Sequence, residues 1–181
     1  MGLMEKGTSP CNTAAAFGDH YAGMALSAGI LAALHKKQQT GEGELVTVSL
    51  FHTAVFGMGL NIVASQYGWD MPISRRQPPN PLNTTYECAD GKWLQLAFFQ
   101  YDKWFPGFCD IVIERPDLKD SVYSKIETAV DHVEEFVIMM EKEFIKRPIA
   151  EWIERLEKAG IPHEPLQTPK QVLEDEQCWA N

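Results

Sequence analysis

The residue best suited to chemistry is an aspartate at the start of an apolar stretch. Asp19 follows Gly18 and precedes the run Tyr21–Leu34, which is rich in alanine, leucine and methionine. Aspartate in this place is a preferred helix N-cap, because its oxygen accepts hydrogen bonds from N–H groups that otherwise lack a partner. The positive end of the helix dipole also keeps a carboxylate ionised there, and an ionised carboxylate can attack an activated acyl group. The pattern favours the cap and leaves the nucleophile open.

Other residues able to do chemistry are dispersed along the chain. The cysteines and histidines are Cys11, Cys88, Cys109, Cys178, His20, His35, His52, His132 and His163. No CxxC or HExxH spacing occurs among them, so we expect structural thiols and no metal. His20 adjoins Asp19 and is a candidate for orienting a substrate, although a histidine beside a helix cap more often packs locally.

Charge and hydropathy exclude several classes of partner. The net charge is -9 and the pI is near 5.0, which argues against nucleic acid and anionic membrane surfaces, because both need a basic footprint. No apolar run approaches the roughly 20 residues that cross a bilayer. The first residues lack the pattern of a signal peptide or a myristoylation signal, so we expect a cytoplasmic protein.

The elements that must position Asp19 have an α/β rhythm. The run Tyr21–Leu34 predicts a buried helix that ends in a cationic turn at Gly41. A β-branched apolar run from Glu44 to Leu50 predicts a buried strand, and a second helix is expected from about Thr53 to Tyr67. Helix, strand and helix in succession are typical of one α/β layer.

The composition then changes, and a second domain is expected. The stretch "GWDMPISRRQPPNPLNT" predicts an exposed linker, with domains at residues 1–75 and 76–181. Asp90-Gly91 predicts a tight hairpin between two β-rich runs. Helical patterns follow at 101–112, from about 124 onward and through "IAEWIERLEKAG", the last stopped by Gly160. "IPHEPLQ" should be extended, and Thr168 should cap a short helix.

Three stretches resemble signatures of the family III CoA-transferases, in the family's order. They are "GDHYAGMALSAGILAALHKKQQTGEGELVTVSLFHTA", "YECADGKWLQLA" and "AEWIERLEKAGIPHEPLQTPKQVLEDEQ". This family includes formyl-CoA and carnitine CoA-transferases and their racemase relatives. Within it, the form "AAAFGDHYAGM" is most similar to clostridial members acting on phenyllactate and 2-hydroxyisocaproate.

The resemblance implies a fold and a mechanism. The fold would be the end of a Rossmann-like large α/β domain (helix, strand, helix), then a linker and a small α+β domain. Asp19 stands where the family keeps its catalytic aspartate, which forms a mixed anhydride and then an aspartyl-CoA thioester. Leu50 falls near an apolar residue beside CoA. The CoA thioester would be a substrate, exchanged with a carboxylic acid, and no cofactor would be permanently bound.

The sequence also departs from the family. Family members are longer and carry, before the "GD" segment, a half that supplies most CoA contacts, so the chain resembles a later piece of such an enzyme. The family's glycine-rich substrate loop is replaced here by "PPNPLNTTY". Members form interlocked homodimers, and "ISRRQPPNPLNT" is a candidate crossing segment.

Two alternative functions stay open. An α-methylacyl-CoA racemase shares the fold and uses an aspartate at this place, with an upstream histidine as second base. A non-catalytic truncated paralogue would act only as an interaction module.

Overall fold

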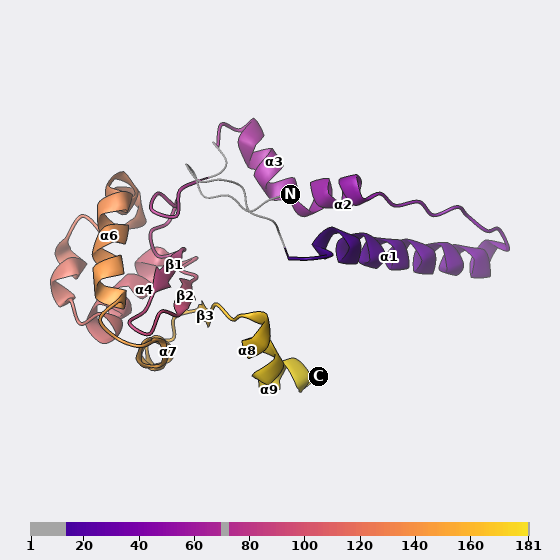
Figure 1. The fold of residues 1–181 in the computed structure, drawn as a ribbon. Coiled ribbons are helices and arrows are strands. Elements are labelled where there is room, and N and C mark those ends of the chain that lie inside the picture. The colour runs from indigo at the N-terminus through magenta and orange to yellow at the C-terminus, as the bar shows by residue number, and fades with distance from the viewer. Residues whose placement is uncertain (1–13, 70–72, 181) are drawn as a thin grey trace. The chain divides into compact units, whose positions relative to one another are not determined.

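The computed structural model describes residues 14–69 and 73–180, which belong to two compact units, Met1–Ile73 (unit 1) and Ser74–Asn181 (unit 2) (Figure 1). Cys11 and part of the expected linker, residues 70–72, lie outside the described residues. Unit 1 carries Asp19, and unit 2 carries the β-hairpin.

Unit 1 is built on one long helix, α1 (Phe17–Thr40). It ends at Gly41, as predicted, because glycine readily adopts the left-handed conformation found there (φ 79°) and its N–H closes the last turn on the Lys37 carbonyl at 2.8 Å. Its start is earlier than the apolar run suggests, and none of its residues is buried. The expectation of a buried helix is therefore wrong for this structure.

The expected strand at 44–50 is an extended segment without strand pairing. This segment packs against α1. A Cβ added to Gly29 would lie only 2.7 Å from Val46 Cγ1, and Lys36 Nζ contacts Glu44 Oε2 at 3.0 Å. A strand needs a neighbour to complete its backbone hydrogen bonds. Among residues 14–69 no strand is present to supply one, which corrects the prediction.

The second predicted helix is divided in two. α2 (Leu50–Gly57) and α3 (Gly59–Gln66) meet at Met58. α2 begins earlier than expected because Ser49 caps it: its Oγ accepts from the His52 N–H at 3.1 Å.

Unit 2 contains a three-stranded antiparallel sheet in the order β1 (Thr85–Glu87), β2 (Trp93–Leu96) and β3 (His163–Pro165). The hairpin predicted at Asp90-Gly91 is confirmed, with Gly91 at φ 71°. The third strand comes from the stretch expected to be extended.

The helices of unit 2 match the predicted patterns. Their bounds are α4 Tyr101–Gly107, a π-helix Phe108–Val112, a 3-10 helix Pro116–Asp120, α5 Ile126–Ala129, a 3-10 turn Val130–His132, α6 Val133–Phe144, α7 Ile149–Lys158, α8 Pro169–Glu174 and α9 Glu176–Trp179. Gly160 terminates α7 at φ 65°, and Thr168 forms a capping box with Gln171 at α8.

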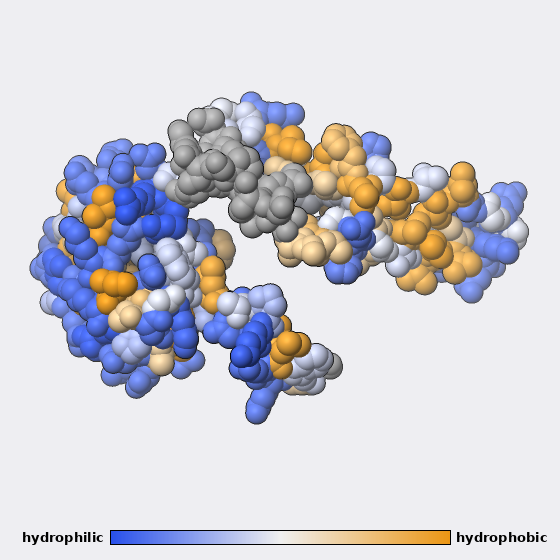
Figure 2. All heavy atoms as spheres, in the orientation of Figure 1, coloured by the Kyte–Doolittle hydropathy of each residue, from blue (hydrophilic) through white to orange (hydrophobic). Residues whose placement is uncertain are grey.

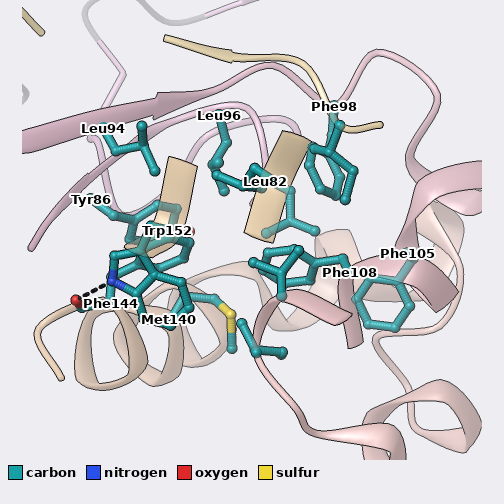
Figure 3. Close-up of a cluster of buried hydrophobic side chains, with 14 of the residues drawn as sticks. Leu82, Tyr86, Leu94, Leu96, Phe98, Phe105, Phe108, Met140, Phe144 and Trp152 are labelled. Atoms are coloured by element: carbon teal, nitrogen blue, oxygen red, sulfur yellow. Dashed lines mark hydrogen bonds between the residues drawn. The ribbon is translucent and has the colours of Figure 1, made fainter. Parts of the chain in front are cut away.

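Side chains from the sheet and the helices form one hydrophobic core in unit 2 (Figure 3). Its largest members include Leu82, Tyr86, Leu94, Leu96, Phe98, Phe105, Phe108, Met140, Phe144 and Trp152. The Trp152 indole N–H donates to the carbonyls of Phe144 (2.8 Å) and Arg147 (3.1 Å), so its polar atom is satisfied inside the core.

The proline-rich stretch is not a free linker over its described length from residue 74. Pro78, Pro81 and Leu82 are buried in unit 2. Asn80 joins this stretch to the end of the sheet, because its Nδ2 donates to the Phe98 carbonyl at 2.6 Å. The expectation of an exposed linker is wrong there, because apolar residues among the prolines complete the core.

Candidate functional site

The structure changes the interpretation of Asp19. Asp19 is the third residue of α1, and the N-cap is Ala16, which has a left-handed conformation (φ 58°) and makes no side-chain cap. The carboxylate therefore does not cap the helix, which corrects the favoured prediction. It is solvent-exposed, and within the described ranges 14–69 and 73–180 it has no hydrogen bond or ion pair.

Asp19 lies in the first turn of α1, where backbone N–H groups have no partner within the helix and can bind an anionic group. A carboxylate that is exposed and not used as a cap keeps its oxygens available to a substrate. The sequence pattern predicted that α1 begins at Asp19, whereas α1 begins about one turn earlier, with Ala16 as its N-cap. The predicted capping role of Asp19 is wrong for this reason.

Leu50 lies beside this turn. A Cβ placed on Gly18 would be 3.9 Å from Leu50 Cδ2, so the beginnings of α1 and α2 are close together. A Cβ on Gly57 would similarly lie 3.6 Å from the Tyr21 ring. Helix α2 therefore packs against the first turns of α1. The Phe17 and Tyr21 rings are also in contact, with centroids 4.9 Å apart. The structure thus places Leu50 next to Gly18, the residue before Asp19.

His20 is adjacent to Asp19 but has no described contact with it. Consecutive helical residues point in different directions, so their side chains do not face each other. The backbone N–H of His20 donates to the Ala16 carbonyl at 2.9 Å, and the imidazole is exposed. A role for His20 in substrate orientation remains a prediction.

The two buried cysteines, Cys88 and Cys109, are poorly suited to nucleophilic chemistry. Burial, followed by the nearby charges of Asp90 and Glu87, raises the pKa of the Cys88 thiol to about 11. Burial also raises the pKa of Cys109 to about 12. Both thiols are therefore protonated near neutral pH and are structural. Within residues 14–69 and 73–180, no three metal-binding side chains come together and no helix has the length and apolarity to cross a bilayer.

A hollow of about 320 Å³ lies on unit 2, and none of the predicted site residues lines it. Its lining consists of Arg75, Arg76, Glu87, Trp93, Glu141, Lys142 and Ile145. The two arginines form ion pairs with Glu141. The two arginines are adjacent in the sequence, but their partner Glu141 is distant in the chain and only the fold brings it near.

Comparison with known proteins decides the family. A family model described as CoA-transferase family III matches residues 1–181. The chain belongs to CoA-transferase family III. It is 54% identical over 179 residues to (R)-2-hydroxy-4-methylpentanoate CoA-transferase of Clostridioides difficile, covering 99% of this chain and 45% of that relative. It is 39% identical to cinnamoyl-CoA:phenyllactate CoA-transferase of Clostridium sporogenes, covering 99% of this chain and 44% of that relative.

Solved structures share the family III fold. A hypothetical protein of Mycobacterium tuberculosis matches with a TM-score of 0.79 at 20% identity, over 99% of this chain and 48% of that chain. A CAIB/BAIF family protein of Brucella suis matches with a TM-score of 0.77 at 22% identity, over 98% of this chain and 47% of that one. The chain spans about half the length of the curated relatives it matches.

Proposed function

We propose that this protein moves CoA between an acyl-CoA and a carboxylic acid, with Asp19 as the covalent carrier. The proposal depends on one observation. The Asp19 carboxylate, in the first turn of α1, is exposed and does not serve as the helix cap, in a chain that belongs to CoA-transferase family III. The preceding residue, Gly18, has no side chain to crowd an approaching thioester, and Leu50 lies beside Gly18.

The proposed reaction divides one acyl exchange into simpler steps. An Asp19 oxygen attacks the thioester carbonyl, the carbon–sulfur bond breaks, and CoA leaves as its thiolate from a mixed anhydride. The thiolate then attacks the carbonyl of Asp19, which releases the first acid together with one Asp19 oxygen and forms an aspartyl-CoA thioester. The acceptor carboxylate attacks this thioester, the carbon–sulfur bond breaks, and a second mixed anhydride forms. The thiolate then attacks the acceptor carbonyl, whose bond to the bridging oxygen breaks, and the new acyl-CoA leaves. Asp19 regains a carboxylate whose replaced oxygen comes from the acceptor.

We propose a 2-hydroxy acid as the acceptor. The support is the identity of the relatives, which are named for 2-hydroxy-4-methylpentanoate and phenyllactate. The family resemblance further supports an interlocked homodimer, a cytoplasmic location and a place in amino-acid fermentation, and we propose these with the activity.

The direct test uses the oxygen exchange at Asp19. The whole protein is allowed to react with an acyl-CoA and an acceptor acid whose carboxylate carries heavy oxygen. The protein is then digested, and the masses of its peptides are measured by mass spectrometry. The peptide containing Asp19 should gain the label, whereas peptides containing the other carboxylates should not. Asp19→Asn should lower turnover about a thousandfold or more, because an amide is a poor nucleophile.

A matched control removes one charge at the opposite end of α1. Glu42 is exposed just beyond that helix, and Glu42→Gln should keep turnover within about twofold. Full transfer by Asp19→Asn, or label on another residue, would refute the nucleophile. Exchange of the α-hydrogen of an acyl-CoA without any acceptor acid would indicate a racemase instead, and no reaction of either kind would indicate an interaction module.

A further inference from the structure

The first residues of unit 2 form a strap, residues 74–84, with two differently held halves. Residues 80–84 are fixed by buried groups: the Tyr86 hydroxyl donates to the Pro81 carbonyl at 2.6 Å, and the Leu82 carbonyl accepts from the Phe98 N–H at 3.2 Å. These bonds belong to the core and the edge of the sheet. The second half is therefore as stable as unit 2 itself.

Charged side chains on helix α6 bind the first half of the strap, residues 74–77. Arg76 is bidentate on Glu141, with Nε 3.2 Å from Oε1 and Nη2 3.0 Å from Oε2. Arg75 forms an ion pair with Glu141 Oε1 through Nη2. One carboxylate thus holds two consecutive arginines, and its side chain is only 22% exposed.

Arg75 also connects this half to the sheet. Its Nη1 donates to the Thr85 carbonyl at 3.0 Å, and its guanidinium lies 5.5 Å from the centre of the Trp93 ring. The Arg75 carbonyl accepts from the Thr84 hydroxyl at 3.3 Å. These contacts orient Arg75 toward Glu141.

The charges around the hollow make Glu141 decisive. Of the described residues that line it, Arg75, Arg76 and Lys142 are cationic, and Glu87 and Glu141 are carboxylates. Removing the Glu141 charge would take away the carboxylate that pairs with both arginines. Two adjacent arginines would then repel each other and Lys142 in a partly buried place, which favours release of the strap.

We propose that Glu141 is a latch that closes the first half of the strap on unit 2. The closed latch fixes the point at which the chain joins unit 2 and shields the peptide bonds after Arg75 and Arg76. The open latch loosens residues 74–77, which keep their other contacts, while residues 80–84 stay in the core. This device is independent of the reaction assigned to Asp19.

Limited digestion of the intact chain by trypsin tests the latch, because trypsin must take an arginine side chain into its own pocket. Cleavage after Arg75 or Arg76 is followed by intact mass, with cleavage after Arg155 in α7 as the internal reference. Glu141→Gln should speed the first two cleavages roughly tenfold and leave the reference unchanged. An unchanged rate in the folded variant would overturn the proposal.

Glu134 provides a matched control on the same helix. It accepts from Gln77 Nε2 at 3.0 Å, so it touches the same half of the strap without binding either arginine. Glu134→Gln makes the same chemical change and should alter the cleavage rates by less than about twofold. Equal acceleration by both variants would show that overall charge, and not the latch, holds the strap.

A second variant keeps the test decisive if Glu141→Gln disturbs unit 2, as judged by circular dichroism. Arg76 is half exposed, so Arg76→Gln should preserve the fold while removing the bidentate part of the latch. Cleavage after Arg75 should then rise about threefold. Protection as strong as in the unmodified protein would contradict the latch.

Discussion

Unit 1 and unit 2 contain similar kinds of apolar residue but place them differently. In unit 2 the aromatic and aliphatic side chains of the sheet and helices are buried together, with Trp152 and Phe144 at most 1% exposed. In unit 1 the described residues include no buried side chain, and Figure 2 shows apolar residues spread over the surface of its helices. Leu45, Phe56 and Leu60 are each more than 80% exposed.

The buried core and the candidate nucleophile lie in different units. Unit 2 contains the buried hydrophobic core, whereas unit 1 carries the candidate nucleophile on helices whose described residues include no buried one. Exposed apolar surface of this extent is typical of a face that is covered in the working protein. The candidate site therefore lies in the unit that depends on further packing.

The largest expected effect comes from separating the units. Residues 74–181 made alone should show one cooperative thermal transition by circular dichroism, because their core is complete. Residues 1–73 made alone should show none and should associate, because their apolar side chains face water. A sharp transition from monomeric residues 1–73 would remove the contrast between the units.

A matched pair of truncations measures the same contrast in one chain. Phe144 packs between Tyr86 and Trp152, with ring centroids 4.8 and 4.7 Å away, so Phe144→Ala should lower the free energy of unfolding by about 3–5 kcal/mol. Phe56 is 85% exposed, and Phe56→Ala should change it by less than about 0.5 kcal/mol. Urea denaturation followed by the near-ultraviolet signal of unit 2 compares the two, and equal losses would contradict the assignment of the core.

The smallest expected effect is a loss of strap stability in acid. Partial burial of Glu141 favours its neutral form, but the hydrogen bonds and charges of Arg75 and Arg76 outweigh this and lower its pKa. Lys142, Glu87 and the buried Tyr86 also face or border this carboxylate.

A carboxyl group with a lowered pKa in the folded state stabilises the protein above the ordinary glutamate pKa, and this stabilisation is lost as the pH falls through the lowered value. Hydrogen exchange of residues 74–77 should therefore accelerate in acid, relative to residues 80–84. In Glu141→Gln this additional acceleration should be absent. The same pH response in that variant would assign the effect to another group.

Local signals in the sequence predicted much of unit 2. The Asp90-Gly91 hairpin, the end of α7 at Gly160 and the capping box at Thr168 each depend on a few consecutive residues. The family, too, was identifiable from quoted motifs and is confirmed by the match over residues 1–181. Such features can be predicted from the sequence because their hydrogen bonds join residues only a few positions apart and do not depend on the rest of the fold.

Two of the errors share one cause, which is dependence on distant residues. The run from Glu44 to Leu50 has a strand pattern, but strand pairing needs a neighbour. The proline-rich stretch looks like a linker, yet Leu82 and Pro81 complete the core of unit 2. The α1 N-cap was misplaced because Ala16, which gives no capping signal in the sequence, begins the helix.

The sequence by itself determined the turns, the C-terminal ends of the helices and the family, since these follow from residue type and short motifs, and the resemblance to that family selected Asp19 as the candidate nucleophile. Tertiary structure alone decided that Leu50 lies beside the first turn of α1 and that Glu141 binds Arg75 and Arg76. The physical reason is that a contact between residues far apart in the chain exists only after the chain has paid the entropy of bringing them together.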